Sequence, residues 1–419
     1  MSAIISPQQI PLLTTKTRLL HSWSRSVVLR MLIGLKYGRL IVKEDSHTMV
    51  FGLDDRLTAT VQVHDPSFYA RVLTAGSIGA GEAFIDGLWD ADDLTAVVRI
   101  LVVNQDVLNQ LEQKVSWLLT PINRLRHSFN GNSRSGSKKN ILAHYDLGND
   151  MYRSFLDPTM MYSAAVYPDA NSSLEQASQY KLDLVCRKIN LQPEDRVIEI
   201  GTGWGGFAIH AALNYGCHVT TTTISDAQYE EAQKRVDDLK LGDRITLLKK
   251  DYRDLKGCFD KLVSIEMIEA VGHRHLPGFI DTCSRLLKAD GVMFIQAITI
   301  KEQLYRSYLN GVDFIQRHIF PGGCLLSNQR LVSLIGENSD MVVRTIDDFG
   351  FDYARTLRDW RSRFSDAFRS LQKRGYDERF RRLWDFYFCY CEGGFLERSV
   401  SVVQLTATKP HNRDHMALP

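Results

Sequence analysis

Residues 197–206 read Val-Ile-Glu-Ile-Gly-Thr-Gly-Trp-Gly-Gly. The short apolar run leads directly into closely spaced glycines, a pattern typical of a buried strand that ends in a tight turn and opens a helix. Gly201, Gly203 and Gly206 keep the Gly-x-Gly-x-x-Gly spacing of a dinucleotide-binding loop. The spacing alone leaves two alternatives open, a nucleotide-type cofactor or a turn that only packs a helix close to a sheet.

Glu199 favours the cofactor interpretation. It is an acidic side chain inside an otherwise apolar strand, immediately before the glycine turn. Enzymes that use S-adenosylmethionine commonly place a carboxylate there, near the amino-acid end of the cofactor. We therefore expect this loop to bind a nucleotide-type cofactor.

Strand-like and helix-like segments alternate along the second half of the chain. This alternation predicts an α/β fold with a Rossmann-like, doubly wound parallel sheet. The predicted strands are Arg196–Ile200, Val219–Ile224, Ile245–Lys249, Lys261–Glu266, Val292–Thr299 and a late strand, Ser399–Ala407. An aromatic and basic insertion, 301–395, precedes the late strand, and we expect it to shape the substrate pocket.

A change in composition predicts the domain boundary. Residues 124–140 are rich in Ser, Gly, Asn and basic side chains, as expected of a linker. The catalytic domain is predicted over 141–410. Residues 1–123 form a predicted smaller α+β domain that either presents substrate and faces a membrane or is a structural cap, and both alternatives stay open.

Composition limits the function classes. The 419 residues carry a net charge of only +2, which excludes a globally basic nucleic-acid binder. Seven scattered cysteines form no disulfide framework and fit a reducing compartment. An apolar run at 26–35 contains Arg30 and is too short to span a bilayer. These features predict a cytoplasmic enzyme, peripherally associated with a membrane.

Ordered motifs along the catalytic domain resemble the cyclopropane fatty acid synthase family. The resemblance covers nearly all of the chain from His144 to the final strand, and the glycine-punctuated segment 76–87 is similar to that of the longer bacterial members. The motifs that carry it are His144–Asp150, Leu156–Pro158, Met161–Ser163, the glycine loop, Thr223–Ser225 with Gln228, Asp251–Asp254, Glu269–Gly272, Ile319–Gly323 and Phe349–Tyr353.

The resemblance implies transfer of a methylene group from S-adenosylmethionine to the cis double bond of an unsaturated acyl chain in a membrane phospholipid, which gives a cyclopropane. The alternative is C-methylation of such lipids, giving a methyl-branched or methylene product. The expected partners are a phospholipid bilayer and a second copy of the chain in a homodimer, with no nucleic acid. The other function classes are a methyltransferase that acts on small molecules or nucleic acid and a catalytically dead lipid-binding protein.

The family's cofactor-binding positions can be transferred residue by residue. Glycine amides approach a ligand closely, polar side chains at strand ends can reach a ribose, and a tyrosine offers a stacking face to adenine. The predicted cofactor-binding residues are Tyr162, Ser163, Glu199, Gly201, Gly203, Thr223, Ile224, Gln228 and Tyr252.

The family is thought to use a bound bicarbonate ion as the base that removes a proton before the ring closes. The resemblance assigns its glutamate and tyrosine ligands to Glu269 and Tyr353, and its backbone ligands to Ala164 and Ile298. The family's histidine position is Gln296, whose amide can still donate a hydrogen bond to an oxyanion but does not titrate. Glu266 is set aside in favour of Glu269, because only Glu269 has the family's Glu-x-Val-Gly context.

Two further patterns, scattered histidines and basic aromatic segments, could mark functional sites or be ordinary surface and core residues. The histidines at 144, 273, 275 and 318 have no zinc-type spacing, so no metal site is predicted. Basic and aromatic residues over 355–384 could dock on anionic head groups or form a solvated helix face. The helix-like segment 15–35, with Trp23, is a second candidate for membrane contact or is buried in its own domain.

Overall fold

The computed structural model describes residues 18–106 and 148–413, which form two compact units. The first contains the described residues up to 106 together with 311–319 and 368–399. The second contains 148–310, 320–367 and 400–413. The predicted linker 124–140 and the start of the His144 motif lie outside the described residues.

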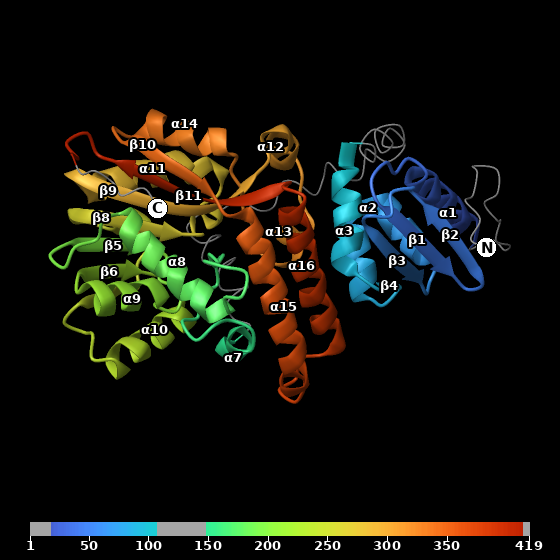
Figure 1. Cartoon of the computed structure of the whole chain (residues 1–419), viewed down its shortest axis with the longest axis horizontal. Coiled ribbons are helices and arrows are strands. Elements are labelled where there is room, and N and C mark those ends of the chain that lie inside the picture. Colours follow the sequence, from blue (N-terminus) through green and yellow to red (C-terminus); the bar gives the residue numbers. More distant parts are fainter. Residues whose placement is uncertain (1–17, 107–147, 414–419) are drawn as a thin grey trace. The chain divides into compact units, whose positions relative to one another are not determined.

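The second unit is built on a seven-stranded sheet in the order β10-β11-β9-β8-β5-β6-β7 (Figure 1). Strands β5 to β9 are parallel, as predicted. Their carboxyl ends therefore share one edge of the sheet, where a nucleotide site is expected. The strands are β5 (Arg196–Ile200), β6 (His218–Thr222), β7 (Ile245–Leu248), β8 (Phe259–Ile265), β9 (Leu287–Ile300), β10 (Val342–Asp348) and β11 (Val400–Thr408).

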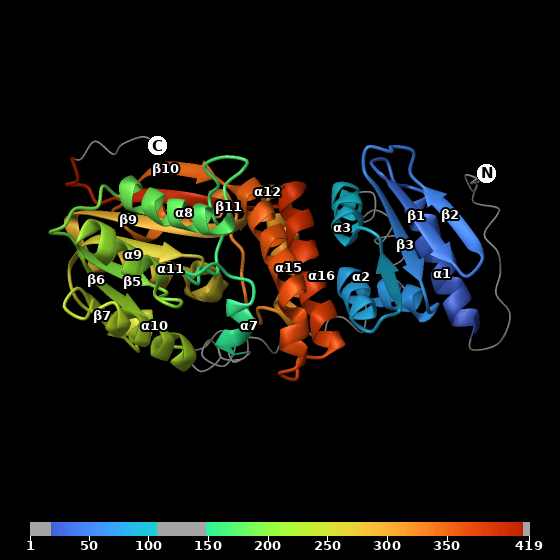
Figure 2. The same ribbon diagram turned by 60° about the horizontal axis from the view of Figure 1, so that its bottom comes forward.

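Helices cover both faces of this sheet (Figures 1 and 2). On one face, α8 (Leu174–Lys188), α9 (Gly206–Tyr215) and α10 (Asp226–Asp238) enclose an apolar core. On the other, α11 (Leu276–Leu286) and α14 (Asn328–Asn338) enclose a second core. The remaining helices of this unit are α7 (Asn149–Arg153), α12 (Glu302–Leu309), the first part of α15 (Gly350–Gln372), and the 3₁₀ turns η2 (Tyr252–Asp254), η3 (Ile268–Ala270) and η4 (His273–His275).

The predicted parallel sheet is confirmed over β5 to β9, and the strands at one edge depart from it. Strand β11 is antiparallel to both β9 and β10. Its apolar run is the same whichever way a strand points, so the sequence pattern did not show its direction. Strand β10 was missed inside the insertion because its burial alternates between exposed and partly buried residues, which leaves no buried apolar run to find.

The first unit contains a four-stranded sheet in the order β2-β1-β3-β4, with β1 and β3 parallel and the other pairs antiparallel. This agrees with the predicted α+β character. Its strands are β1 (Arg39–Glu44), β2 (His47–Phe51), β3 (Thr58–Val63) and β4 (Trp89–Ala91), and its helices are α1 (Arg18–Leu32), α2 (Ser67–Ile85), α3 (Leu94–Val103), α13 (Phe314–His318) and α16 (Glu378–Leu396).

The insertion 301–395 does not fold as one part of the catalytic domain. Helix α16 packs against α2 and α3 in the first unit. Arg382 of α16 donates hydrogen bonds to the Trp89 carbonyl and to Asp90, and Thr95 of α3 donates to Glu392 at 2.9 Å. These contacts join residues about 300 positions apart, which sequence periodicity does not report.

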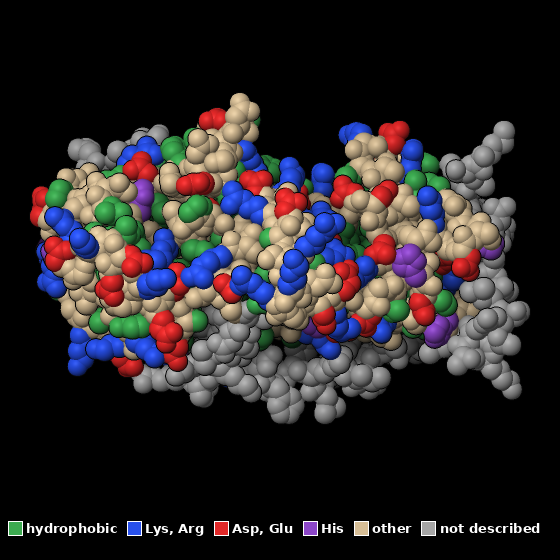
Figure 3. Space-filling view, turned by 90° about the horizontal axis from the view of Figure 1, so that it is seen from below, with side chains coloured by type: hydrophobic (Ala, Val, Ile, Leu, Met, Phe, Trp, Pro, Cys, Tyr) green, Lys and Arg blue, Asp and Glu red, His purple; other side chains and the backbone are tan. Residues whose placement is uncertain are grey.

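The aromatic and basic residues over 355–384 are largely engaged within the protein. Trp360, Phe364 and Trp384 are buried. Arg381 pairs with Glu378, and Arg379 pairs with Asp86. Basic and acidic side chains are intermixed on the face shown in Figure 3. Within residues 18–106 and 148–413, no helix is both long and apolar enough to cross a bilayer.

The contact of α16 with α3 depends on Gly393. A methyl group there would lie 2.6 Å from Val98 Cγ1, inside contact distance, whereas one at Gly336 on α14 would meet nothing. We expect Gly393→Ala to destabilise the protein by about 1–3 kcal/mol through overpacking. The matched Gly336→Ala should stabilise it by about 0.5–1 kcal/mol. Thermal unfolding of both variants measures the difference, and equal shifts would contradict the close approach.

Candidate active site

The glycine loop is a tight turn between β5 and α9. Gly201, Gly203 and Gly205 have φ angles of +105°, +53° and +85°, which L side chains rarely adopt. A Cβ at Gly206 would lie 2.4 Å from Met161 Sδ, whereas a Cβ at Gly203 would meet nothing within 4 Å. Gly206 therefore allows close packing against Met161, whereas Gly203 faces free space. The two interpretations of the glycine pattern, a packing turn and a cofactor loop, thus apply to different glycines.

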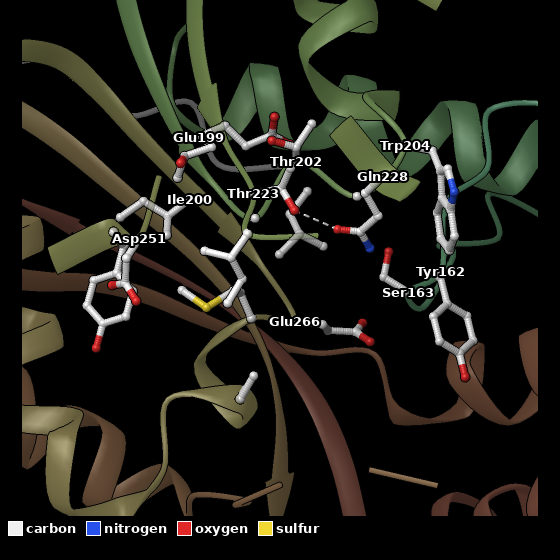
Figure 4. Close-up of a pocket in the computed structure, with 18 of the residues that line it drawn as sticks. Tyr162, Ser163, Glu199, Ile200, Thr202, Trp204, Thr223, Gln228, Asp251 and Glu266 are labelled. Atoms are coloured by element: carbon white, nitrogen blue, oxygen red, sulfur yellow. Dashed lines mark hydrogen bonds between the residues drawn. The ribbon is translucent and has the colours of Figure 1, made fainter. Parts of the chain in front are cut away.

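A pocket opens at this turn, at the carboxyl ends of β5, β6 and β8 (Figure 4). All nine predicted cofactor-binding residues line it. Further lining residues that were not predicted include Met161, Trp204, Asp251, Glu266 and Met267. The structure thus brings segments from 160 to 271 around one cavity.

Polar side chains at the strand ends are held by one another. Thr221 Oγ1 donates to Glu199 Oε2 at 2.6 Å and lies 2.7 Å from Thr202 Oγ1. Thr223 Oγ1 donates to Gln228 Oε1 at 2.8 Å, the dashed line of Figure 4. These bonds fix the side chains in advance, so a ligand would not have to order them.

A buried lysine lies behind the pocket. Lys181 of α8 is fully buried, and its Nζ donates to Ser163 Oγ at 2.8 Å. Burial lowers the pKa of Lys181 to about 8, while the carboxylates of Glu266, Asp157 and Glu199 oppose that shift. Burial raises the pKa of Glu199 to about 8, against the opposing effects of Thr221 and Lys181. The site therefore keeps ionisable groups of both signs in an apolar interior.

Aromatic rings surround Tyr162, another pocket residue. Its ring centroid lies 5.3 Å from those of Tyr152 and Trp360 and 6.1 Å from that of Phe320. Trp360 in turn meets Tyr353 edge-on at 6.0 Å. The faces of such rings attract cations, and their bulk excludes water.

Three of the five residues predicted to be catalytic converge on Glu266, which was not among them. Its Oε1 accepts hydrogen bonds from the Ala164 N–H at 2.8 Å and from Gln296 Nε2 at 2.7 Å. Its Oε2 accepts one from the Tyr353 hydroxyl at 2.8 Å. Figure 4 shows the Glu266 side chain extending toward Ser163 and Tyr162.

The other two residues form a separate pair. Glu269 Oε1 accepts a hydrogen bond from the Ile298 N–H at 2.6 Å. Its Oε2 is buried and has no hydrogen-bond partner among the described residues. The five residues therefore do not surround one common ion in this arrangement.

The two carboxyl groups differ in their support. Burial and, after it, the charge of the nearby Glu266 together raise the pKa of Glu269 to about 8. Burial also raises the pKa of Glu266, but Gln296, the Ala164 N–H, Lys181 and Tyr353 oppose the rise. Since Glu266 has three donors and Glu269 accepts one hydrogen bond, from a backbone N–H, the carboxylate form is better stabilised on Glu266 than on Glu269.

Gln296 has its orientation fixed by a chain of buried side chains. Gln404 Nε2 donates to Gln296 Oε1 at 3.0 Å, and Lys188 Nζ donates to Gln404 Oε1 at 2.8 Å. The Gln296 amide nitrogen is thereby directed at Glu266. The amide was predicted to donate a hydrogen bond to an oxyanion. In the structure it donates to a carboxylate of the chain itself, that of Glu266.

Sequence reasoning missed Glu266 as a site residue and Lys181 altogether. Glu266 was considered and rejected on motif context, although its position at the end of β8, next to β5, was a usable signal. Lys181 lies in the amphipathic sequence of α8, where a lysine gives no indication of burial.

Comparison with known proteins agrees with this geometry. The family model described as mycolic acid cyclopropane synthetase matches residues 132–405. The chain belongs to this family. It is 36% identical over 355 residues to the cyclopropane-fatty-acyl-phospholipid synthase of Escherichia coli, covering 84% of this chain and 88% of that one. It is 35% identical over 376 residues to the tuberculostearic acid methyltransferase UfaA1 of Mycobacterium tuberculosis, covering 88% and 87%.

A solved structure shows the same fold. The mycolic acid cyclopropane synthase CmaA1, complexed with SAH and CTAB, superposes with a TM-score of 0.61 at 29% identity. The match covers 65% of this chain and 98% of CmaA1. The protein is thus an S-adenosylmethionine-dependent methyltransferase of the cyclopropane synthase type.

The pocket suits this cofactor. It combines a glycine turn with free space above Gly203, a buried carboxylate at Glu199 and preset polar groups at Thr223 and Gln228. A cationic, nucleoside-containing ligand needs a counter-charge and hydrogen-bonding partners of this kind. The roles of the individual residues stay predictions.

Gly203→Ala should weaken cofactor binding at least about tenfold, or about 1.4 kcal/mol, because the added methyl group enters space that the ligand needs. Gly87→Ala is the matched control, since Gly87 also has a positive φ, +74°, with nothing within 4 Å, but lies in the first unit. Calorimetric titration measures both. Equal affinities in the two folded variants would contradict the assignment of this loop.

Binding of S-adenosylmethionine should release a proton. The pKa of Glu199 is raised to about 8, so this group is largely protonated near neutral pH in the cofactor-free protein. A bound cation favours the carboxylate and lowers that pKa, so affinity should rise with pH up to about 8 and then level off. Calorimetry in buffers of different ionisation enthalpy detects the proton. Glu199→Gln should abolish the proton release that comes from this group. A wild type whose binding enthalpy does not depend on the buffer would contradict this prediction.

Proposed function

We propose that this protein transfers a methylene group from S-adenosylmethionine to the cis double bond of unsaturated acyl chains in membrane phospholipids, forming cyclopropane rings. The observation that carries the proposal is a carboxylate, Glu266, that lines the cofactor pocket beside a cluster of aromatic rings. The family relatives named for cyclopropane synthesis support the same chemistry.

The residues of the chain serve distinct steps of this reaction. When bound, the cofactor supplies an electrophilic methyl group on a sulfonium centre. The glycine turn, Thr223 and Gln228 position it, since an isolated alkene is a weak nucleophile and needs close alignment. Tyr162 and the rings behind it exclude water and stabilise a cation on the acyl chain. A base must then take a proton from the delivered carbon before the ring can close.

The bicarbonate ion implied by the resemblance does not fit the residues present. Its expected donors, the Ala164 N–H, Gln296 and Tyr353, already donate to the Glu266 carboxylate. Its expected backbone ligand Ile298 donates to Glu269. No step is therefore assigned to bicarbonate.

We also propose that the enzyme takes its substrate at a bilayer surface, because the double bond of a phospholipid lies within the apolar layer. Trp23 and Leu53, 45% and 76% exposed in the first unit, are apolar side chains available for shallow insertion. The homodimer stays a prediction, supported by the resemblance alone.

Lipid mass spectrometry tests the function. The protein should be expressed in a host without such an enzyme, with Gly203→Ala as the impaired control. We expect phospholipid acyl chains to gain one CH₂ and to lose their reactivity toward ozone, because the alkene has become a ring. A gain of CH₂ with the alkene retained would indicate the alternative, C-methylation. Unchanged acyl chains would contradict a lipid substrate.

The same assay with purified protein and vesicles addresses the bilayer proposal. Product should form on acyl chains of intact phospholipids. Activity confined to free fatty acids would contradict it.

A further inference from the structure

We propose that Glu266 is itself the base of the reaction and occupies, with its own carboxylate, the anion site that an external ion would otherwise fill. This inference rests on the proposed function and deepens it, since it names the group that accepts the proton. The evidence is geometric: three donors from three separate segments, the Ala164 N–H, the Gln296 amide and the Tyr353 hydroxyl, all point at one side chain.

The position of Glu266 suits a base. The residue lines the cofactor pocket, whereas Glu269 is not among the lining residues. Its three hydrogen bonds use both carboxylate oxygens and hold the group in one orientation. Oε1 accepts two of these bonds and Oε2 accepts one, so Oε2 keeps a lone-pair direction at which the carboxylate can accept a proton while all three bonds persist.

The backbone conformation of Glu266 also supports a functional role for its side chain. Its φ angle is +49°, in the left-handed region that disfavours residues with a Cβ. Glycine would fit this conformation without that cost. A glutamate kept here at a conformational cost, inside an apolar site, is consistent with a role in chemistry.

The step balances without a further reactant. As the alkene π electrons form the new C–C bond, the methyl C–S bond breaks, which leaves a thioether and a cation on the second alkene carbon. Glu266 accepts one proton from the delivered methyl carbon, and the electron pair of that C–H bond closes the ring. The neutral acid then returns its proton to solvent water, which restores the carboxylate.

Two variants of Glu266 test the proposal by activity. Glu266→Gln keeps the size of the side chain and fills the site but accepts no proton, so we expect a loss of about 10²–10⁴-fold in product formation with cofactor binding retained. Glu266→Gly fits the backbone and removes the carboxylate that the three donors share. It should lose activity as well, but recover part of it in a saturable way when bicarbonate or formate is added. Glu266→Gln should not recover.

The wild type should turn over at the same rate in bicarbonate-depleted and bicarbonate-supplemented buffer. Either a wild type that slows on depletion, or a Glu266→Gln variant at the wild-type rate, would overturn the proposal. Failure of Glu266→Gly to respond to any added anion would count against the anion site.

A binding measurement separates this inference from the proposed function. Carbon NMR of isotope-labelled bicarbonate should show binding to Glu266→Gly and none to the wild type, whatever the substrate. If the wild type modifies no lipid, the proposed function fails while this measurement still decides whether Glu266 fills the site. Bicarbonate bound by the wild type at the Tyr353 hydroxyl, and lost in Tyr353→Phe, would overturn the inference.

Discussion

The burial of ionisable groups beneath one pocket is the constraint on which the catalytic unit depends. Glu199, Glu266 and Lys181 lie at or behind the carboxyl ends of the central strands. An isolated charge in such an interior would neutralise itself, so each needs a partner. The observed hydrogen bonds of Thr221, Ser163 and Tyr353 supply these partners. The same bonds fix the side chains before any ligand arrives.

This arrangement divides the site by chemistry. Around the glycine turn, free space and preset polar groups suit a nucleoside with a positive charge. Around Tyr162, a cluster of edge-on and tilted rings suits an apolar chain and a transient cation. Glu266 lies where the two regions meet. A single carboxylate can therefore reach a carbon that passes from the cofactor to the acyl chain.

The departure at Gln296 and the position of Glu266 fit together. Gln296 stands where the family has a histidine, and Glu266 takes the hydrogen bonds that the resemblance assigned to an ion. Glutamine donates to a carboxylate without competing for its proton, as a titrating imidazole would. The chain Lys188–Gln404–Gln296 holds that amide in the donating orientation. Gln296 and Glu266 are thus mutually consistent in physical terms.

The sequence by itself determined the catalytic fold and the cofactor pocket. Both depend on local patterns: buried strands, a glycine turn and polar residues at parallel strand ends, which the sheet must bring to one edge. Only the tertiary structure decided the direction of the edge strand and the unit against which the last helix packs. Whether β11 runs parallel or antiparallel, and which unit α16 joins, depends on contacts between distant residues.

The choice between Glu266 and Glu269 shows the same limit at the scale of one side chain. The two are three residues apart, and motif context favoured Glu269. The fold turns Glu266, with its φ of +49°, toward the Ala164 N–H, Gln296 and Tyr353. Those donors come from segments about 30 to 100 positions away, and only the packed structure brings their hydrogen-bonding groups to one carboxylate.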